Sequence, residues 1–175
     1  AIVPASVLGP NAPGNRISVT DALGRTTDFT YDRNNRRLRE TSPAVTDPVT
    51  GLPVRYTVQH QYDANGNEIA TTDANGHVTR FSFDRDNRVV MVEDANGIKT
   101  VFTYDSRSNR TSVQIGVQAH FDTTQRHVVV DSTENAQVTT HAYDEFNQRV
   151  ATTDGVGNAL VSSDSALYRE VRKSF

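Results

Sequence analysis

Aspartate offers the most chemistry in this chain, because it follows an aromatic residue at nearly regular intervals. The pairs are Tyr31-Asp32, Tyr62-Asp63, Phe83-Asp84, Tyr104-Asp105, Phe121-Asp122 and Tyr143-Asp144. Paired carboxylates can serve as acid and base in glycoside hydrolysis. An Asp that opens a tight turn instead accepts hydrogen bonds from nearby backbone N–H groups. Because an active site should interrupt a repeat rather than follow it, the spacing favours the turn role, and we assign no catalytic residue.

The turn at residues 63–68 and the histidines are the candidates for a metal site. In that turn Gly66 is the fourth residue, whereas an EF-hand loop needs glycine at its sixth position and flanking helices. The histidines show no His-x-x-x-His spacing and are His60, His77, His120, His127 and His141. His60 and His141 stand where other repeats carry Phe, which favours a row of stacked rings. We therefore predict neither a metal ion nor a cofactor.

Four tyrosines are the candidate contacts for a glycan, namely Tyr31, Tyr62, Tyr104 and Tyr143. Aromatic faces stack on sugar rings, while Asn, Asp and Arg hydrogen-bond to hydroxyl groups. The same tyrosines are also needed to cover a sheet. Arg37, Arg110 and Arg149 each fall five residues after their turn Asp, where they could form a cross-strand ladder with acidic residues or join the sugar-binding surface.

Chain reversals recur about every ten residues in the middle of the sequence. The turn aspartates there are Asp63, Asp73, Asp84, Asp94 and Asp105, at steps of 10 or 11 residues. Asp-Ala-Asn-Gly is typical of a type I turn followed by a left-handed residue, a conformation that Gly adopts at low cost. The expected turn glycines are Gly24, Gly66, Gly76, Gly97 and Gly157.

Between the turns, side chains alternate with the period of a strand, and Val and Thr dominate. The sequence therefore predicts an all-β fold, an antiparallel meander of about seven hairpin repeats that forms a curled or spiral sheet segment. Each repeat has about 21 residues. The structural anchors are Tyr31-Asp32, Tyr62-Asp63, Phe83-Asp84, Tyr104-Asp105 and Tyr143-Asp144.

Residues 1–175 are predicted to form a single array, with clear repeats from about 15 to 155 and degenerate ends. A Pro- and Gly-containing loop at residues 42–55 is inserted into one repeat. Residues 11–17 are similar in sequence to the turn at 63–69 and are interpreted as a degenerate copy of it. The step of 17 residues before Phe121 indicates a repeat that has lost about four residues. The irregular stretch 114–130 leaves room for a degenerate enzyme site, and residues 164–173 are the one helical candidate.

Composition excludes several classes of protein. Lys and Arg number 18 against 21 Asp and Glu, which leaves no basic surface for nucleic acid. There is no Cys, so disulfides and thiolate chemistry are absent. Because the chain begins at Ala1, we interpret it as a piece of something longer. Unprotected sheet edges pair with other copies, so we expect an edge-to-edge homodimer of the isolated segment.

The Tyr-Asp anchors at a spacing of 21 residues, together with the turns at residues 21–27 and 63–69, resemble the Rhs/YD-repeat family. That family includes bacterial Rhs polymorphic toxins, the C subunits of insecticidal toxin complexes, and teneurins. The resemblance implies a β-sheet strip that spirals into a hollow shell around a C-terminal toxin domain. It also implies secretion or display on a bacterial cell surface.

From this resemblance we expect a structural shell segment whose partners are the remaining shell and a toxin domain of the parent chain. The alternative is an adhesion module that binds cell-surface glycans. Residues 47–52, Asp-Pro-Val-Thr-Gly-Leu, are similar to part of the self-cleavage region of Rhs toxins. They lie between the first two clear repeats, however, and lack the usual continuation, which favours a plain loop over a cleavage site.

Overall fold

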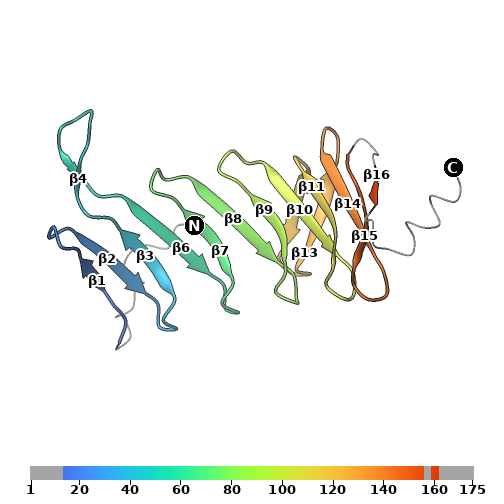
Figure 1. The fold of residues 1–175 in the computed structure, drawn as a ribbon, viewed down its shortest axis with the longest axis horizontal. Helices are drawn as coiled ribbons and strands as arrows, with labels where there is room; N and C mark the ends of the chain where they lie inside the picture. Colours follow the sequence, from blue (N-terminus) through green and yellow to red (C-terminus); the bar gives the residue numbers. More distant parts are fainter. Residues whose placement is uncertain (1–13, 156–158, 162–175) are drawn as a thin grey trace, which may run out of the picture. The chain divides into compact units, whose positions relative to one another are not determined.

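The computed structural model describes residues 14–155 and 159–161, where the regular secondary structure consists of strands (Figure 1). The chain divides into two compact units, of which the first ends at Arg80 and the second begins at Phe81. No helix among the described residues is long and apolar enough to cross a membrane. Gly157 and the helical candidate at 164–173 lie outside the described residues.

The first unit contains a meander in which most strands pair with their neighbours in sequence. Its strands are β1 (Ser18–Thr20), β2 (Thr26–Tyr31), β3 (Arg37–Thr41), β4 (Val45–Thr46), β5 (Pro53–Val54), β6 (Thr57–Tyr62), β7 (Glu68–Thr72) and β8 (Val78–Phe83), the last of which continues past the division. Strand β3 pairs directly with β6, and residues 42–56 leave the sheet as a separate β4–β5 hairpin.

The second unit repeats this organisation. Its strands are β9 (Val89–Glu93), β10 (Lys99–Tyr104), β11 (Arg110–Ile115), β12 (Gln118–Asp122), β13 (His127–Ser132), β14 (Gln137–Tyr143), β15 (Arg149–Thr153) and β16 (Ala159–Val161). Strand β11 pairs directly with β14, while β12 and β13 form a two-stranded sheet of their own. The predicted all-β antiparallel meander is therefore confirmed.

The expectation that the repeat around Phe121 has lost about four residues is wrong. Phe121-Asp122 lies in an inserted hairpin, β12–β13, and the sheet continues as if this hairpin were absent. An aromatic residue followed by a turn Asp marks a hairpin, whether or not that hairpin stays in the main sheet.

Equivalent residues occupy the same register in successive hairpins. The ring two residues before each anchor faces the ninth residue after that anchor, as in Phe29↔Glu40, His60↔Thr71, Phe102↔Val113 and His141↔Thr152. A bulge follows, at which the anchor aromatic pairs with the sixth residue after itself, as in Tyr62↔Glu68. This constant register results from the turn, because turn type and length fix the pairing of a hairpin.

The hydrophobic core of the second unit lies under the inserted hairpin. Met91 and Val101 on the sheet pack with Val117 and Ala119 from the insertion, all four buried. Phe121, Val128 and Ala136 pack against this cluster. Polar contacts also hold the insertion against the sheet, since Lys99 Nζ on β10 donates to the Ala119 carbonyl on β12 at 2.6 Å. Arg126 donates to the Asp84 carbonyl at 3.1 Å.

Candidate functional site: the repeat turns

Eight aspartates in the described residues share one turn geometry. One carboxylate oxygen, Oδ1, accepts the backbone N–H groups of the second and fourth residues that follow, at 2.8 or 2.9 Å. They are Asp21, Asp32, Asp63, Asp73, Asp84, Asp94, Asp105 and Asp144. The backbone N–H of each aspartate also donates to the carbonyl of the fourth following residue. These carboxylates are thus engaged in closing their own turns.

The third residue after each aspartate has a positive φ. Four of these residues are glycines, namely Gly24, Gly66, Gly76 and Gly97. The other four are Asn35, Asn87, Ser108 and Asn147. Gly and Asn tolerate the left-handed region best, so seven of these eight residue types match the backbone, and Ser108 is the exception. All the turn glycines expected from the sequence lie at such turns, except Gly157, which is outside the described residues.

The fourth residue after the aspartate closes the turn a second time, a role that the sequence analysis missed. Its side chain bonds to the other carboxylate oxygen, Oδ2, in six of the eight turns. The residues are Arg25, Arg36, Asn67, His77, Arg88 and Asn109, at 2.6 to 3.1 Å. The signal for this role is the recurring pattern Asp-x-x-x-(Arg/Asn/His) in the sequence, one position before that of Arg37 and Arg110.

Two of these arginines connect one repeat to the next. The Arg36 guanidinium lies 4.7 Å from the centre of the Tyr62 ring and donates to the Asp63 carbonyl at 3.0 Å. In the second unit Arg88 lies 4.8 Å from the centre of the Tyr104 ring and donates to the Asp105 carbonyl at 3.3 Å. A planar guanidinium can stack on a ring and form several directed hydrogen bonds at once.

The anchor tyrosines form a second connection between repeats. Three of the hydroxyls donate to the backbone carbonyl of the first residue of a strand in a neighbouring hairpin, and the hydroxyl of Tyr31 donates to the carbonyl of Arg16, two residues before β1. The bonds run from Tyr31 to Arg16, from Tyr62 to Arg37, from Tyr104 to Val89 and from Tyr143 to Arg110, at 2.8 to 3.1 Å. These hydroxyls therefore have a structural use, and the role of the tyrosines in glycan contact stays a prediction.

The three arginines expected in a ladder or a sugar-binding surface do not act as one set. Arg37 pairs with Glu40 of its own strand at 2.7 Å. Arg110 lies 5.6 Å from the centre of the Phe102 ring. The anchor Phe83 ends β8 and has no hydroxyl to donate. Among the described residues, no group of three His, Cys, Asp or Glu side chains is placed to hold a metal ion.

The two histidines at the ring position have opposite surroundings. His60 Nδ1 lies 2.9 Å from Glu68 Oε1, and its ring stacks near that of Tyr62. His141 Nδ1 lies 3.1 Å from Thr152 Oγ1. Burial, followed by the charges of Arg149 and Arg110 on the flanking strands, lowers the pKa of His141. The folded chain therefore favours the neutral form of the His141 ring over the protonated form.

We expect His141 to make the second unit sensitive to mild acid. Because the folded-state pKa lies below the ordinary value of about 6.5, the unfolded chain binds the proton first. Stability is then lost as pH falls through the interval between the two values. His141→Phe, which installs the ring found at Phe102, should remove this loss. Urea unfolding at pH 7.5 and 5.5 checks it, and an unchanged pH dependence in the variant would contradict it.

We expect a further loss of stability in stronger acid, from the turn aspartates. At Asp84 burial alone would raise the pKa, but the backbone N–H and guanidinium of Arg88 outweigh it, and the pKa is lowered. The pKa is also lowered at Asp21, Asp32, Asp47, Asp73, Asp105 and Asp122.

Lowered carboxyl pKa values contribute stability that is present above the ordinary value of about 3.9 and is lost as pH falls through the folded-state values. Circular dichroism during thermal unfolding should therefore show a falling melting temperature between pH 4 and 2. A melting temperature that holds constant over this range would show that the turn carboxylates gain nothing from folding.

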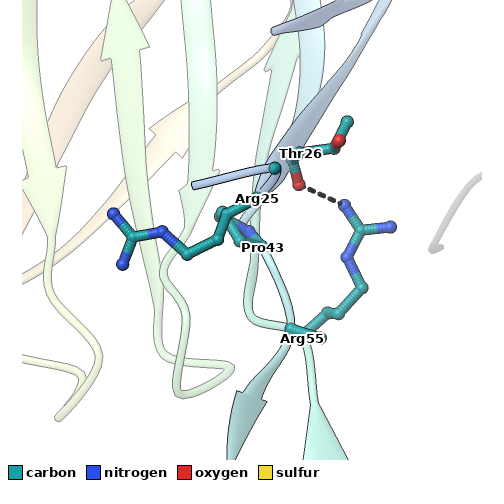
Figure 2. A pocket seen from close by; sticks show the side chains of 6 residues that line it. Arg25, Thr26, Pro43 and Arg55 are labelled. Carbon is teal, nitrogen blue, oxygen red and sulfur yellow. Dashed lines mark hydrogen bonds between the residues drawn. The ribbon is translucent and has the colours of Figure 1, made fainter. Parts of the chain in front are cut away.

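A depression of about 380 Å³ lies at the base of the β4–β5 hairpin (Figure 2) and is lined by Gly24, Arg25, Thr26, Pro43, Ala44 and Arg55. Arg55 donates to the Thr26 carbonyl at 3.1 Å and pairs with Asp28 at 2.7 Å. Arg25 pairs with its turn aspartate. At the hairpin tip, Asp47 Oδ1 accepts the N–H groups of Val49 and Thr50. The Asp47-Pro48 stretch thus has the geometry of a capped turn.

Comparison with known proteins gives one family and several solved structures. The family described as RHS Repeat matches residues 11–44 and 62–97, which confirms the resemblance inferred from the turn motifs. No curated protein matches the chain.

The solved structures are more distant. TcdB2-TccC3 without its hypervariable C-terminal region is similar with a TM-score of 0.40 and 13% identity, covering 74% of this chain and 8% of that one. TcdB2-TccC3 gives 0.36 and 13% over 74% and 8%. The Tc holotoxin pore of Photorhabdus luminescens, with a mutated TccC3, gives 0.35 and 13% over 74% and 7%. The chain thus spans less than a tenth of each of these three solved chains.

Proposed function

This chain carries RHS repeats, and we propose that it is a wall segment of a larger Rhs-type shell, in which the sheet acts as a scaffold and not as a catalyst. The observation that carries the proposal is the use of the repeat carboxylates. Each of the eight turn aspartates accepts two backbone N–H groups of its own turn. A carboxylate held in this way stabilises the reversal of the chain and is poorly placed to exchange protons with a substrate.

The links between repeats support the same role. Tyrosine hydroxyls and the guanidinium groups of Arg36 and Arg88 join each hairpin to a neighbour through side chain to backbone bonds. Such bonds stiffen a strip of hairpins along its length without depending on one central core. This matches the logic of repeat proteins, in which stability is a sum of repeat and nearest-neighbour terms.

Within this proposal, the shell belongs to a secreted bacterial protein and encloses a toxin domain of the same parent chain. The partners of this segment are then the neighbouring shell repeats and the enclosed domain. The low apolar content supports a wall with water on at least one face, because 35% hydrophobic residues cannot supply a dense core on both sides of a sheet.

The test is the structure and protease resistance of the natural protein that contains this chain. Electron microscopy should show the repeats as a β wall around an interior that holds another segment of the protein. That enclosed segment should resist trypsin in the native protein and be cut after heating. An extended stalk of repeats, with every other segment cut equally fast before and after heating, would overturn the proposal.

A further inference from the structure

The tetrapeptide Asp-Ala-Asn-Gly forms three turns of this chain, and each turn exposes an Asn-Gly pair. The pairs are Asn65-Gly66, Asn75-Gly76 and Asn96-Gly97. In such a pair the backbone nitrogen of glycine can attack the side-chain carbonyl carbon of asparagine. A carbon–nitrogen bond forms, ammonia leaves, and water opens the resulting succinimide ring to aspartate or isoaspartate. Because the tetrapeptide is identical, differences in rate among the three pairs reflect how firmly each turn is closed.

A closed turn keeps the reacting atoms apart, as the turn between β9 and β10 shows. The Gly97 N–H donates to the Asp94 carbonyl at 3.0 Å, and the Asn96 N–H donates to Asp94 Oδ1 at 2.9 Å. Asn96 does not have a positive φ, so the turn is of type I, in which ψ of the third residue is about 0°. Ring closure needs a different ψ, at which the glycine nitrogen eclipses the asparagine Cβ. The reaction therefore requires the turn to open, and its rate follows the population of the open turn.

The three turns differ in the side-chain bond that opposes opening. In the first, Asn67 Nδ2 donates to Asp63 Oδ2 at 3.0 Å, and in the second, His77 Nδ1 lies 3.1 Å from Asp73 Oδ2. The third turn has Ile98 at this position, which is 47% exposed and has no polar side-chain atom. The turn that contains Asn96 therefore has one closing bond fewer than the other two.

We propose that Asn96 is a site of spontaneous deamidation and the first of the three Asn-Gly pairs to react. The position gives the modification a structural effect, because isoaspartate adds its Cβ to the main chain of the turn. That turn joins β9 to β10, across which Met91 pairs with Val101, and both side chains belong to the buried cluster under the inserted hairpin. Since turn geometry sets the register of a hairpin, deamidation at Asn96 loosens this cluster.

Incubation of the full 175-residue chain in mildly alkaline buffer, followed by peptide mass spectrometry, gives the conversion rate of each pair. We expect Asn96 to react about two- to threefold faster than Asn65 and Asn75, the ratio that one exposed closing bond provides. In the urea-unfolded chain the three rates should converge. Equal rates in the folded chain, or an equally large excess at Asn96 in the unfolded chain, would overturn the proposal.

Ile98→Asn tests the cause, because it supplies the closing bond that Asn67 and Asn109 form in their own turns. We expect it to slow the reaction of Asn96 to the rate of Asn65. The matched control is Ile98→Leu, which has nearly the shape of asparagine but no donor and should keep the original rate. An unchanged or faster reaction in Ile98→Asn, or equal slowing in both variants, would contradict the assignment.

The structural effect has its own measurement. Deamidation adds a negative charge, so ion exchange separates the modified fraction of the aged chain from the unmodified one. Hydrogen exchange of the Val101 amide should be faster in the fraction modified at Asn96, whereas the amides of β6 and β7 in the first unit should exchange at the same rate in both. Equal exchange of Val101 in the two fractions would show that the modification leaves the cluster intact.

Discussion

Replacing Val101 by Asp should lower the free energy of unfolding of the second unit by more than about 3 kcal/mol, because it buries a charge in an apolar cluster. Val101 is 2% exposed and lies between Met91 of the sheet and the inserted β12–β13 hairpin. Lys99, two residues away on β10, already donates to the Ala119 carbonyl. We therefore expect the insertion to detach from the sheet before the sheet itself unfolds.

The matched control is Val130→Asp, because Val130 lies in β13 of the inserted hairpin itself and is 37% exposed. We expect this substitution to change stability by less than about 0.5 kcal/mol. Urea unfolding gives the two free energies, and hydrogen exchange of the β9, β10 and β12 amides shows where the loss occurs. Equal effects of the two substitutions would show that the cluster around Val101 does not hold the insertion in place.

The second large effect is expected at Asp84, where Asp84→Ala should cost about 2–3 kcal/mol of stability. This side chain accepts the N–H groups of Asp86 and Arg88 at 2.9 Å and holds the Arg88 guanidinium at 2.7 Å. Without the carboxylate, Arg88 also loses the contact that directs it onto the Tyr104 ring. The substitution therefore removes a turn cap and a link between repeats together.

Asp94→Ala provides the comparison, because Asp94 caps its turn with the same two backbone bonds at 2.9 Å but is followed by Ile98 at the arginine position. We expect this substitution to cost about 1 kcal/mol, the usual effect of losing a cap. The difference between the two variants isolates the contribution of Arg88. If chemical denaturation gives equal losses for Asp84→Ala and Asp94→Ala, the arginine link contributes nothing to stability.

The sequence by itself determined the hairpins, because each one is specified by residues close together in the chain. Asp63 and Gly66 fix one chain reversal through a side-chain cap and a left-handed backbone. The alternation of side chains along the strands then sets which residues share a face of the sheet. For the same reason the turn aspartates and glycines of the described repeats could be located without a structure. The residue at the fourth position after the aspartate also follows a pattern in the sequence, because it bonds within its own turn.

Only the tertiary structure decided which hairpins stay in the sheet and what each side chain meets beyond its own hairpin. Phe121-Asp122 has the local sequence pattern of a repeat. Its hairpin nevertheless packs on the sheet and is not part of it, because Val117 and Ala119 are buried against Met91 and Val101 while β11 pairs directly with β14. Arg88 meets the Tyr104 ring only because the next hairpin brings that ring beside it. A local motif encodes a turn, whereas the free energy of packing between distant segments selects its neighbours.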